Sequence, residues 1–304
     1  MVPILDWGEF LQSPESFAAK LGRTCRDHGF FVIENHPVAA ELIAQMFQQA
    51  DAFFALPDAQ KRPLAISNNP HNRGWAAMGT ESLDETSGQI DQKQAFNVGF
   101  DLAPDDPRVL AGEPFRGVNI WPDLPGFKAT ALAYFDAVQS MGIALHRAFA
   151  ADLGLPLDYF DAHFDAPMAT LRMLSYPADP SGEGIGAGAH TDYGSITLLM
   201  TDGAPGLQVK PRGQDWMDVP AVDGAFIVNI GDCLMRWSNR TYISTPHRVL
   251  APPRARRSIA FFLDPNPDSV IEALPGTGEA RYPAITAADY LRSRLDATYK
   301  PLGA

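Results

Sequence analysis

Apolar residues recur at helical spacing in two long stretches of the front half of the chain. In residues 39–54 the apolar residues are Ile43, Met46, Phe47, Ala50, Phe53 and Phe54, and in residues 127–153 they are Leu132, Phe135, Val138, Leu145, Phe149 and Leu153. Residues three and four apart lie on one face of a helix. We therefore predict two amphipathic helices, closed by Leu56-Pro57 and by Gly154 with Pro156, whose apolar faces pack on a core rather than on a cofactor.

After Pro167 the pattern changes to short apolar runs separated by Gly, Pro and Asp. The predicted strands are Thr170 to Tyr176, Ile196 to Thr201, Leu207 to Lys210, Phe226 to Ile230, Leu234 to Trp237, Arg248 to Leu250 and Ser258 to Leu263. Regular short strands of this kind indicate a sandwich or a barrel. Residues 66–126 are rich in Pro, Gly, Asn and Asp, so we interpret them as long loops that carry substrate contacts.

Composition excludes several classes of protein. Hydrophobic residues are 46% and charged residues 20% of a chain of 304 residues, which is typical of a globular protein with a large core. The net charge of -12 disfavours nucleic acid or an anionic membrane as a partner. Cys25 and Cys233 cannot form a disulfide framework, so we expect buried thiols. Without a long apolar stretch or an export signal, the sequence predicts a cytoplasmic protein with no membrane span.

The most informative chemistry is His190-Thr191-Asp192, followed fifty-seven positions after that histidine by His247. Residues i and i+2 of a strand point to the same face, so His190 and Asp192 can hold one metal ion. Two imidazoles and one carboxylate leave coordination positions open, which is typical of non-haem Fe(II) oxygenases. A zinc hydrolase or a non-catalytic metal-binding protein could use the same three ligands.

A second His-x-Asp sequence, His163-Phe164-Asp165, tests how specific this motif is. Its neighbours predict a helix end or a loop with no following strand, and nothing downstream completes a ligand set. By contrast, His190 follows the glycine-rich segment 182–188 and leads into residues 193–200, which read as a loop entering a strand. We therefore assign the metal site to His190, Asp192 and His247.

The motifs around these ligands resemble a known family. They are His190-Thr191-Asp192-Tyr193-Gly194 with Thr197-Leu198-Leu199, Asn229-Ile230-Gly231-Asp232, Trp237-Ser238-Asn239, Ser244, His247-Arg248-Val249, and Arg256-x-Ser258 with Phe261-Phe262. Further matches are Pro3-Ile4-Leu5-Asp6, Cys25 to Phe31, Asn35-His36, Arg73-Gly74-Trp75, Asp91-Gln92-Lys93 and Arg281-Tyr282-Pro283. In order and spacing they are similar to the Fe(II)/2-oxoglutarate dioxygenases of the isopenicillin N synthase type, over nearly the whole chain.

The resemblance implies a mainly β protein with flanking helices: a double-stranded β-helix, or jelly roll, behind a helix-rich N-terminal region. It divides the chain into 1–126, an N-terminal α/β region with substrate-side loops; 127–165, a long helix and connector; 166–267, the jelly-roll core; and 268–304, a C-terminal extension, all in one compact unit. Iron would lie inside one open end of the jelly roll. The front helices would pack against the outside of a sheet.

The resemblance also implies the cofactors Fe(II) and 2-oxoglutarate. His190, Asp192 and His247 would hold the iron, and Arg256, Ser258 and Tyr176 would bind the far carboxylate of 2-oxoglutarate. Arginine suits that task because its planar guanidinium pairs bidentately with a carboxylate. Arg256 and Ser258 share one strand face, whereas Arg257 lies on the opposite face, where we expect a solvated or surface-paired side chain.

Substrate contacts are predicted less directly. Arg172 and Leu174 alternate with Tyr176, so we expect them to face the cavity, where a buried Arg172 needs an anionic partner from the substrate or the protein. Loop residues Lys93, Phe96 and Asn97 border the substrate entrance in the family. Phe262 and Trp75 are expected as aromatic pocket residues. From Arg172 and Lys93 we expect a small-molecule substrate with a carboxylate or another anionic group.

The predicted function is oxidation of a small molecule by molecular oxygen, as hydroxylation, desaturation or cyclisation, with decarboxylation of 2-oxoglutarate to succinate and CO2. The alternatives are a cosubstrate-free iron oxidase similar to isopenicillin N synthase, an ethylene-forming type of enzyme, and a non-catalytic metal-binding jelly roll.

Asp232 is interpreted as part of a turn before a strand. His28 and His36 match family positions remote from iron, so we expect structural roles for both, and His71 and His146 lack metal-ligand spacing.

Overall fold

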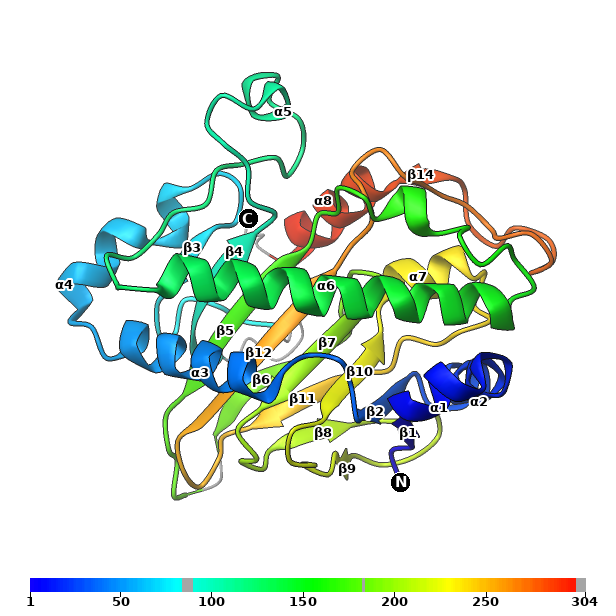
Figure 1. Ribbon diagram of the computed structural model, residues 1–304. Coiled ribbons are helices and arrows are strands. Elements are labelled where there is room, and N and C mark those ends of the chain that lie inside the picture. The colour runs from blue at the N-terminus through cyan, green and yellow to red at the C-terminus, as the bar shows by residue number, and fades with distance from the viewer. Residues whose placement is uncertain (84–89, 182–183, 299–304) are drawn as a thin grey trace.

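The computed structural model describes residues 1–83, 90–181 and 184–298 (Figure 1). Its strands are β1 Ile4–Asp6, β2 Phe30–Glu34, β3 Gly74–Ala76, β4 Gln94–Gly99, β5 Thr170–Tyr176, β6 Ile185–His190, β7 Ile196–Thr201, β8 Leu207–Val209, β9 Met217–Asp218, β10 Phe226–Ile230, β11 His247–Leu250, β12 Arg256–Leu263, β13 Val270–Ile271 and β14 Ile285–Thr286. Its α-helices are α1 Trp7–Gln12, α2 Pro14–Asp27, α3 Ala40–Phe54, α4 Asp58–Lys61, α5 Pro107–Leu110, α6 Phe127–Asp152, α7 Asp232–Trp237 and α8 Ala287–Thr298.

Two sheets form the centre of the molecule. The larger sheet has the strand order β1-β2-β10-β7-β12-β5-β4-β3, and the smaller has the order β6-β11-β8-β9. Apolar residues from both sheets form one buried cluster, which includes Val32 and Leu174 of the larger sheet and Leu207 and Val249 of the smaller. The sheets therefore pack face to face with a core between them, as a jelly roll requires, and this confirms the predicted fold class.

The outer face of the larger sheet is covered by helices. Figure 1 shows α6 running across this sheet with α3 beside it, while the C-terminal α8 lies above α6 in this view. The Phe135 ring of α6 meets the Phe261 ring of β12 at a centroid distance of 4.8 Å. Both predicted amphipathic helices are present, as α3 and α6, and their apolar faces belong to this second core.

Five details of the sequence interpretation are wrong, and the first three concern α7 and residues 66–126. Leu234 to Trp237 is not a strand but part of helix α7, which begins at Asp232 rather than following a turn there. A four-residue apolar run is too short to show whether its period is helical or extended, and burial of Cys233 and Trp237, four residues apart, fits the helix. Residues 66–126 are not only loops, because β3 and β4 extend the larger sheet at its edge.

The glycine-rich segment before His190 is also misread, since residues 185–190 form strand β6 rather than a loop. His190 ends β6, and Asp192 lies in the connection to β7, so the two residues do not share one strand. Cys25 and Cys233 are buried free thiols, as expected. Within the described ranges no helix is both long and apolar enough to cross a membrane.

Candidate active site

The three predicted metal ligands come together between the two sheets. His247, the first residue of β11, is paired with His190 at the end of β6, and their imidazole centroids are 4.4 Å apart. Asp192 Oδ1 lies 3.7 Å from His190 Nε2 and 3.6 Å from His247 Nε2. One ligand atom from each residue lies within 4.8 Å of the others. The tertiary structure thus brings two imidazole nitrogens and one carboxylate oxygen to one point.

Neighbouring groups orient these ligands. Asp192 Oδ2 accepts hydrogen bonds from Thr197 Oγ1 at 2.5 Å and from Asn229 Nδ2 at 2.8 Å, which leaves Oδ1 turned toward the histidines. His190 Nδ1 donates to the Gly188 carbonyl at 2.7 Å. Because a carbonyl oxygen can only accept, this bond places the proton on Nδ1 and makes Nε2 the ligand atom.

The charge states of two of the three ligands suit a cation. Burial and, less strongly, proximity to His247 lower the pKa of His190 to about 4, so this imidazole is neutral at pH 7. Burial alone would raise the pKa of Asp192, yet His247, His190 and Thr197 hold it below its ordinary value. Burial opposes protonation of His247, but the Asp192 carboxylate outweighs it and raises the pKa of His247. A metal ion therefore competes with a proton for His247, whereas the neutral His190 and the ionised Asp192 are ready to bind a cation.

The three residues predicted to bind 2-oxoglutarate line the same cavity as the ligands. Arg256 pairs with Tyr176 across β12 and β5, and its guanidinium carbon lies 5.0 Å from the Tyr176 ring centroid. Arg256 Nη1 donates to Ser258 Oγ at a long 3.4 Å, and the buried Nε has no hydrogen-bond partner among the described residues. Arg256 is 1% exposed. This buried cation has no carboxylate within 4 Å in the part of the chain that the structure describes.

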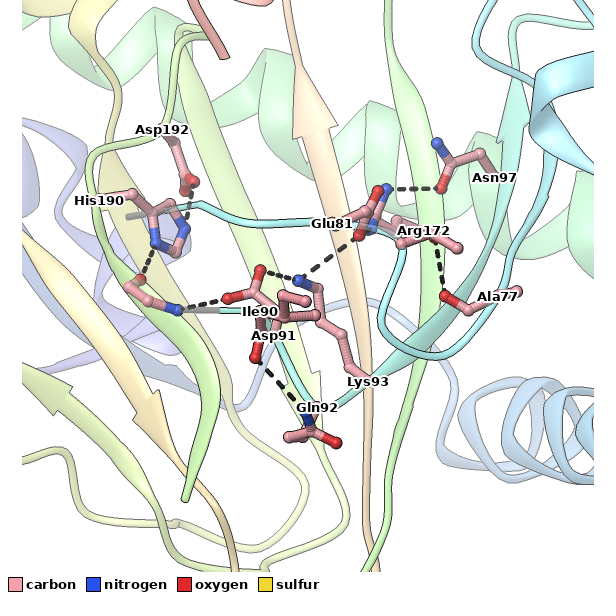
Figure 2. Close-up of polar contacts among 12 residues, drawn as sticks. Ala77, Glu81, Ile90, Asp91, Gln92, Lys93, Asn97, Arg172, His190 and Asp192 are labelled. Carbon is pink, nitrogen blue, oxygen red and sulfur yellow. Dashed lines mark hydrogen bonds and ion pairs between the residues drawn. The ribbon is translucent and has the colours of Figure 1, made fainter. Parts of the chain in front are cut away.

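The predicted substrate residues have mixed outcomes. Arg172, Leu174, Lys93, Asn97 and Phe262 all line the cavity, as expected, although Lys93 is 3% exposed and not at an open entrance. The structural alternative for Arg172 is correct, since its partner is the Glu81 carboxylate (Figure 2). Lys93 is paired with Asp91.

Two aromatic residues lie outside the cavity lining. The Trp75 indole donates to Gln94 Oε1 at 3.1 Å, with the Lys61 ammonium over its ring. The Phe96 ring packs on Phe53. Phe96 was expected near the substrate entrance from the family resemblance and Trp75 as an aromatic pocket residue, yet on β4 and β3 their side chains join the helix-side core.

Three charged cavity residues were given no role from the sequence: Glu81, Arg73 and Asp264. Glu81 follows no motif, so no signal points to it. Arg73 stands in a family motif and is 3% exposed, with Nη1 donating to the His71 carbonyl at 3.0 Å. Asp264 directly follows β12, and burial, reinforced by Asp192, raises its pKa to about 7. Only the packing of the elements reveals all three.

The residues set aside by the sequence also lie apart from the metal ligands. His163 ends a 3-10 turn, and its Nδ1 lies 3.1 Å from Ser269 Oγ. Arg257 is paired with Asp202 at 3.3 Å and with Asp51 at the outer face, which confirms a surface-paired side chain. His146 is fully buried in α6.

Comparison with known proteins identifies the family of this chain. Residues 2–124 match the family model for the N-terminal region of non-haem dioxygenases in morphine synthesis, and residues 162–265 match the 2OG-Fe(II) oxygenase superfamily. The 2-oxoglutarate-Fe(II) type oxidoreductase hxnY of Emericella nidulans is 36% identical, over 98% of this chain and 90% of that protein. The crystal structure of a full-length Neurospora crassa protein in complex with alpha-KG has a TM-score of 0.87 and 34% identity, covering 98% of this chain and 96% of that one. A second structure of the same Neurospora crassa protein, with alpha-KG and thymine, has a TM-score of 0.86 and 34% identity, covering 98% of this chain and 97% of that one. The chain therefore belongs to the Fe(II)- and 2-oxoglutarate-dependent oxygenases, enzymes that oxidise small molecules.

Proposed function

We propose that His190, Asp192 and His247 bind the catalytic Fe(II) of this oxygenase. The observation that carries the proposal is the convergence of Nε2, Nε2 and Oδ1 within 4.8 Å at the wall of one cavity. Two imidazoles and one carboxylate with space on the cavity side fit a metal that must also accept exogenous ligands. When bound, Fe(II) and 2-oxoglutarate supply the oxidation, in which O2 is consumed and 2-oxoglutarate is decarboxylated to succinate and CO2.

The protein's own groups prepare this chemistry. Thr197 and Asn229 keep the Asp192 carboxylate in one orientation, and the Gly188 carbonyl fixes the His190 tautomer. Arg256, with Ser258 and Tyr176, offers a buried positive charge to the far carboxylate of 2-oxoglutarate. We propose this trio as the cosubstrate clamp.

The ligand assignment is tested by two matched histidine variants. His190→Ala should abolish stoichiometric Fe(II) binding under anaerobic conditions, because it removes one of three ligands. His163→Ala removes the histidine of the other His-x-Asp sequence and should leave one Fe(II) per chain. Iron binding that survives the first substitution and is lost in the second would show that the site has been assigned to the wrong pair.

We also propose that the substrate carries an anionic group, and that Arg73 receives it rather than Arg172 or Lys93. The charges of Arg172 and Lys93 are balanced by Glu81 and Asp91. Arg73 lines the same cavity, is 3% exposed, and has no carboxylate within ion-pair distance among the described residues. Burial lowers the pKa of Arg73 to about 10, and nearby Arg116 contributes, yet it stays charged at pH 7. A buried cation of this kind is stabilised by a ligand carboxylate.

A panel of small carboxylic acids and their carboxamides tests this proposal through substrate-stimulated decarboxylation of 2-oxoglutarate. The similar proteins do not show whether the substrate of this chain is anionic, since the second Neurospora crassa structure named above holds thymine. We expect the acid of a pair to be turned over in preference to its amide, and Arg73→Met to raise KM for the acid while leaving the affinity for 2-oxoglutarate unchanged. Equal turnover of acid and amide by wild type would contradict an anionic substrate. An unchanged KM in a folded Arg73→Met variant would contradict the role of Arg73.

A further inference from the structure

A chain of buried polar contacts runs from the substrate side of the cavity to the metal site (Figure 2). Arg172 of β5 pairs with Glu81, and Glu81 Oε2 lies 3.4 Å from Lys93 Nζ. Lys93 pairs closely with Asp91, whose other oxygen, Oδ1, accepts a hydrogen bond from the Gly188 backbone N–H at 2.9 Å. The side chains of Lys93 and Asp91 are 2% and 0% exposed. Two carboxylates and two cations thus contact one another, with Lys93 and Asp91 buried and the side chains of Arg172 and Glu81 13% and 12% exposed.

Burying an ion pair of this kind does little for stability by itself. Desolvation of two charges offsets most of their attraction, and apolar residues of similar volume are often equally stabilising. The pair is better explained by a role in fixing the position of the backbone that Asp91 contacts. The group that Asp91 contacts outside the charged set is the N–H of Gly188, in the strand that ends at His190.

Strand β6 needs such a support at this point. It lies at the edge of the smaller sheet, and its pairing with β11 is irregular, with shifts in register between His247 and Val249 and between Val249 and Leu250. Its sequence, Ile-Gly-Ala-Gly-Ala-His, carries little side-chain bulk to hold it. Segment 91–92 docks on it through two bonds, Gln92 N–H to the Ile185 carbonyl at 3.1 Å and Gly188 N–H to Asp91.

Gly188 connects this docking to the metal ligand. Its N–H is held by Asp91, and its carbonyl accepts the His190 Nδ1 proton at 2.7 Å. A shift of the Gly188 backbone would therefore rotate or release the His190 ring. Groups that orient a ligating histidine affect metal affinity although they do not touch the metal.

We propose that Asp91, held in place by Lys93, is a positioning residue for His190. Lys93 is then a support for Asp91 rather than a substrate contact, in agreement with its burial and its two carboxylate neighbours. The proposal rests on His190 being a metal ligand, which the His190→Ala experiment tests separately.

Two double variants isolate the contact to Gly188. Asp91→Asn/Lys93→Met removes the ion pair but keeps a side-chain oxygen that can accept from the Gly188 N–H. Asp91→Leu/Lys93→Met removes both, and because each variant lacks Lys93, neither leaves a buried ammonium without its partner. The measurements are Co(II) affinity of the metal-free proteins, followed by absorbance, and their thermal unfolding without metal.

We expect Asp91→Leu/Lys93→Met to bind Co(II) at least about tenfold more weakly than Asp91→Asn/Lys93→Met, the usual effect of losing a group that orients a metal ligand. A smaller ratio would overturn the proposal. If the leucine variant does not fold, Asp91→Val/Lys93→Met takes its place under the same criterion. Failure of both apolar variants to fold while the asparagine variant folds would also overturn it, since the role of Asp91 would then be structural. If His190→Ala loses metal binding but the two double variants do not differ, this proposal fails while the ligand assignment stands.

Discussion

Replacing Arg256 by leucine removes a cation that has no carboxylate partner among the residues that the structure describes. Arg256 is 1% exposed, its Nε has no hydrogen-bond partner in the described ranges, and its bond to Ser258 is 3.4 Å long. In the proposed complex the far carboxylate of 2-oxoglutarate fills this place. Arg256→Leu should therefore weaken 2-oxoglutarate binding specifically, because Arg256 contacts none of the three proposed metal ligands through a hydrogen bond or ion pair in the described chain.

The magnitude follows from the kind of contact that is lost. A hydrogen bond to a charged group contributes about 1.5 to 3 kcal/mol, which corresponds to a roughly tenfold to 150-fold weaker Kd. The loss is larger if the carboxylate of 2-oxoglutarate stays buried without its partner. Ser258→Ala and Tyr176→Phe each remove one neutral donor and should cost about 0.5 to 1.5 kcal/mol.

The assay is anaerobic titration of the Fe(II) protein with 2-oxoglutarate, followed by the visible charge-transfer band of the chelated 2-oxo acid. Arg257→Leu is the matched control, because Arg257 is the next residue on the same strand but pairs with Asp202 and Asp51 on the opposite face. The control should titrate like wild type. Affinity for Fe(II) should be unchanged in both variants.

Two results would refute this reasoning. One is a Kd for 2-oxoglutarate in Arg256→Leu within about threefold of wild type, and the other is an equal loss in Arg257→Leu. Thermal unfolding of the metal-free proteins gives an independent check. Because a buried unpaired charge is unfavourable, Arg256→Leu should not unfold at a lower temperature than wild type.

Three further predictions concern stability and the metal ligands. His146 is fully buried, and burial lowers its pKa to about 4, so unfolding takes up a proton below the unfolded pKa of about 6.5 and the protein loses about 2 kcal/mol of stability by pH 5. In denaturant unfolding at pH 7.5 and pH 5, His146→Gln should therefore lose about 2 kcal/mol less between the two pH values than wild type, and an equal loss in both proteins would refute the prediction. Gly22→Ala places a methyl group 1.9 Å from the Asp152 carboxyl, which is too close, so chemical denaturation should show that the free energy of unfolding falls by about 1 to 3 kcal/mol. A fall of less than about 0.5 kcal/mol would contradict this and mean that α2 can move away at little cost. Thr197→Val removes the hydroxyl donor to Asp192 Oδ2 and should weaken Co(II) binding about 10-fold to 100-fold, whereas an unchanged Kd would show that Asn229 alone orients the carboxylate.

Local sequence was sufficient for the features that depend on backbone periodicity. The apolar spacing of α3 and α6 follows from 3.6 residues per turn, and the opposite directions of Arg256 and Arg257 follow from the alternation of a strand. Where a run was too short to show a period, as in Leu234 to Trp237, the sequence prediction failed. The prediction of a loop in the glycine-rich segment of β6 failed for a related reason. Glycine and alanine give no alternation of apolar and polar residues, and this segment is a strand because it pairs with β11.

The sequence by itself therefore determined the family and the residue types proposed as metal ligands and as the 2-oxoglutarate clamp, because these are set by residue chemistry at fixed spacing. Only the tertiary structure decided which cavity charges are balanced. Arg172 meets Glu81 ninety-one positions away, and Asp91 reaches Gly188 across ninety-seven, so neither contact leaves a local pattern. Buried charges are paired with whichever groups the packing brings near, and that packing is a property of the whole chain rather than of any segment.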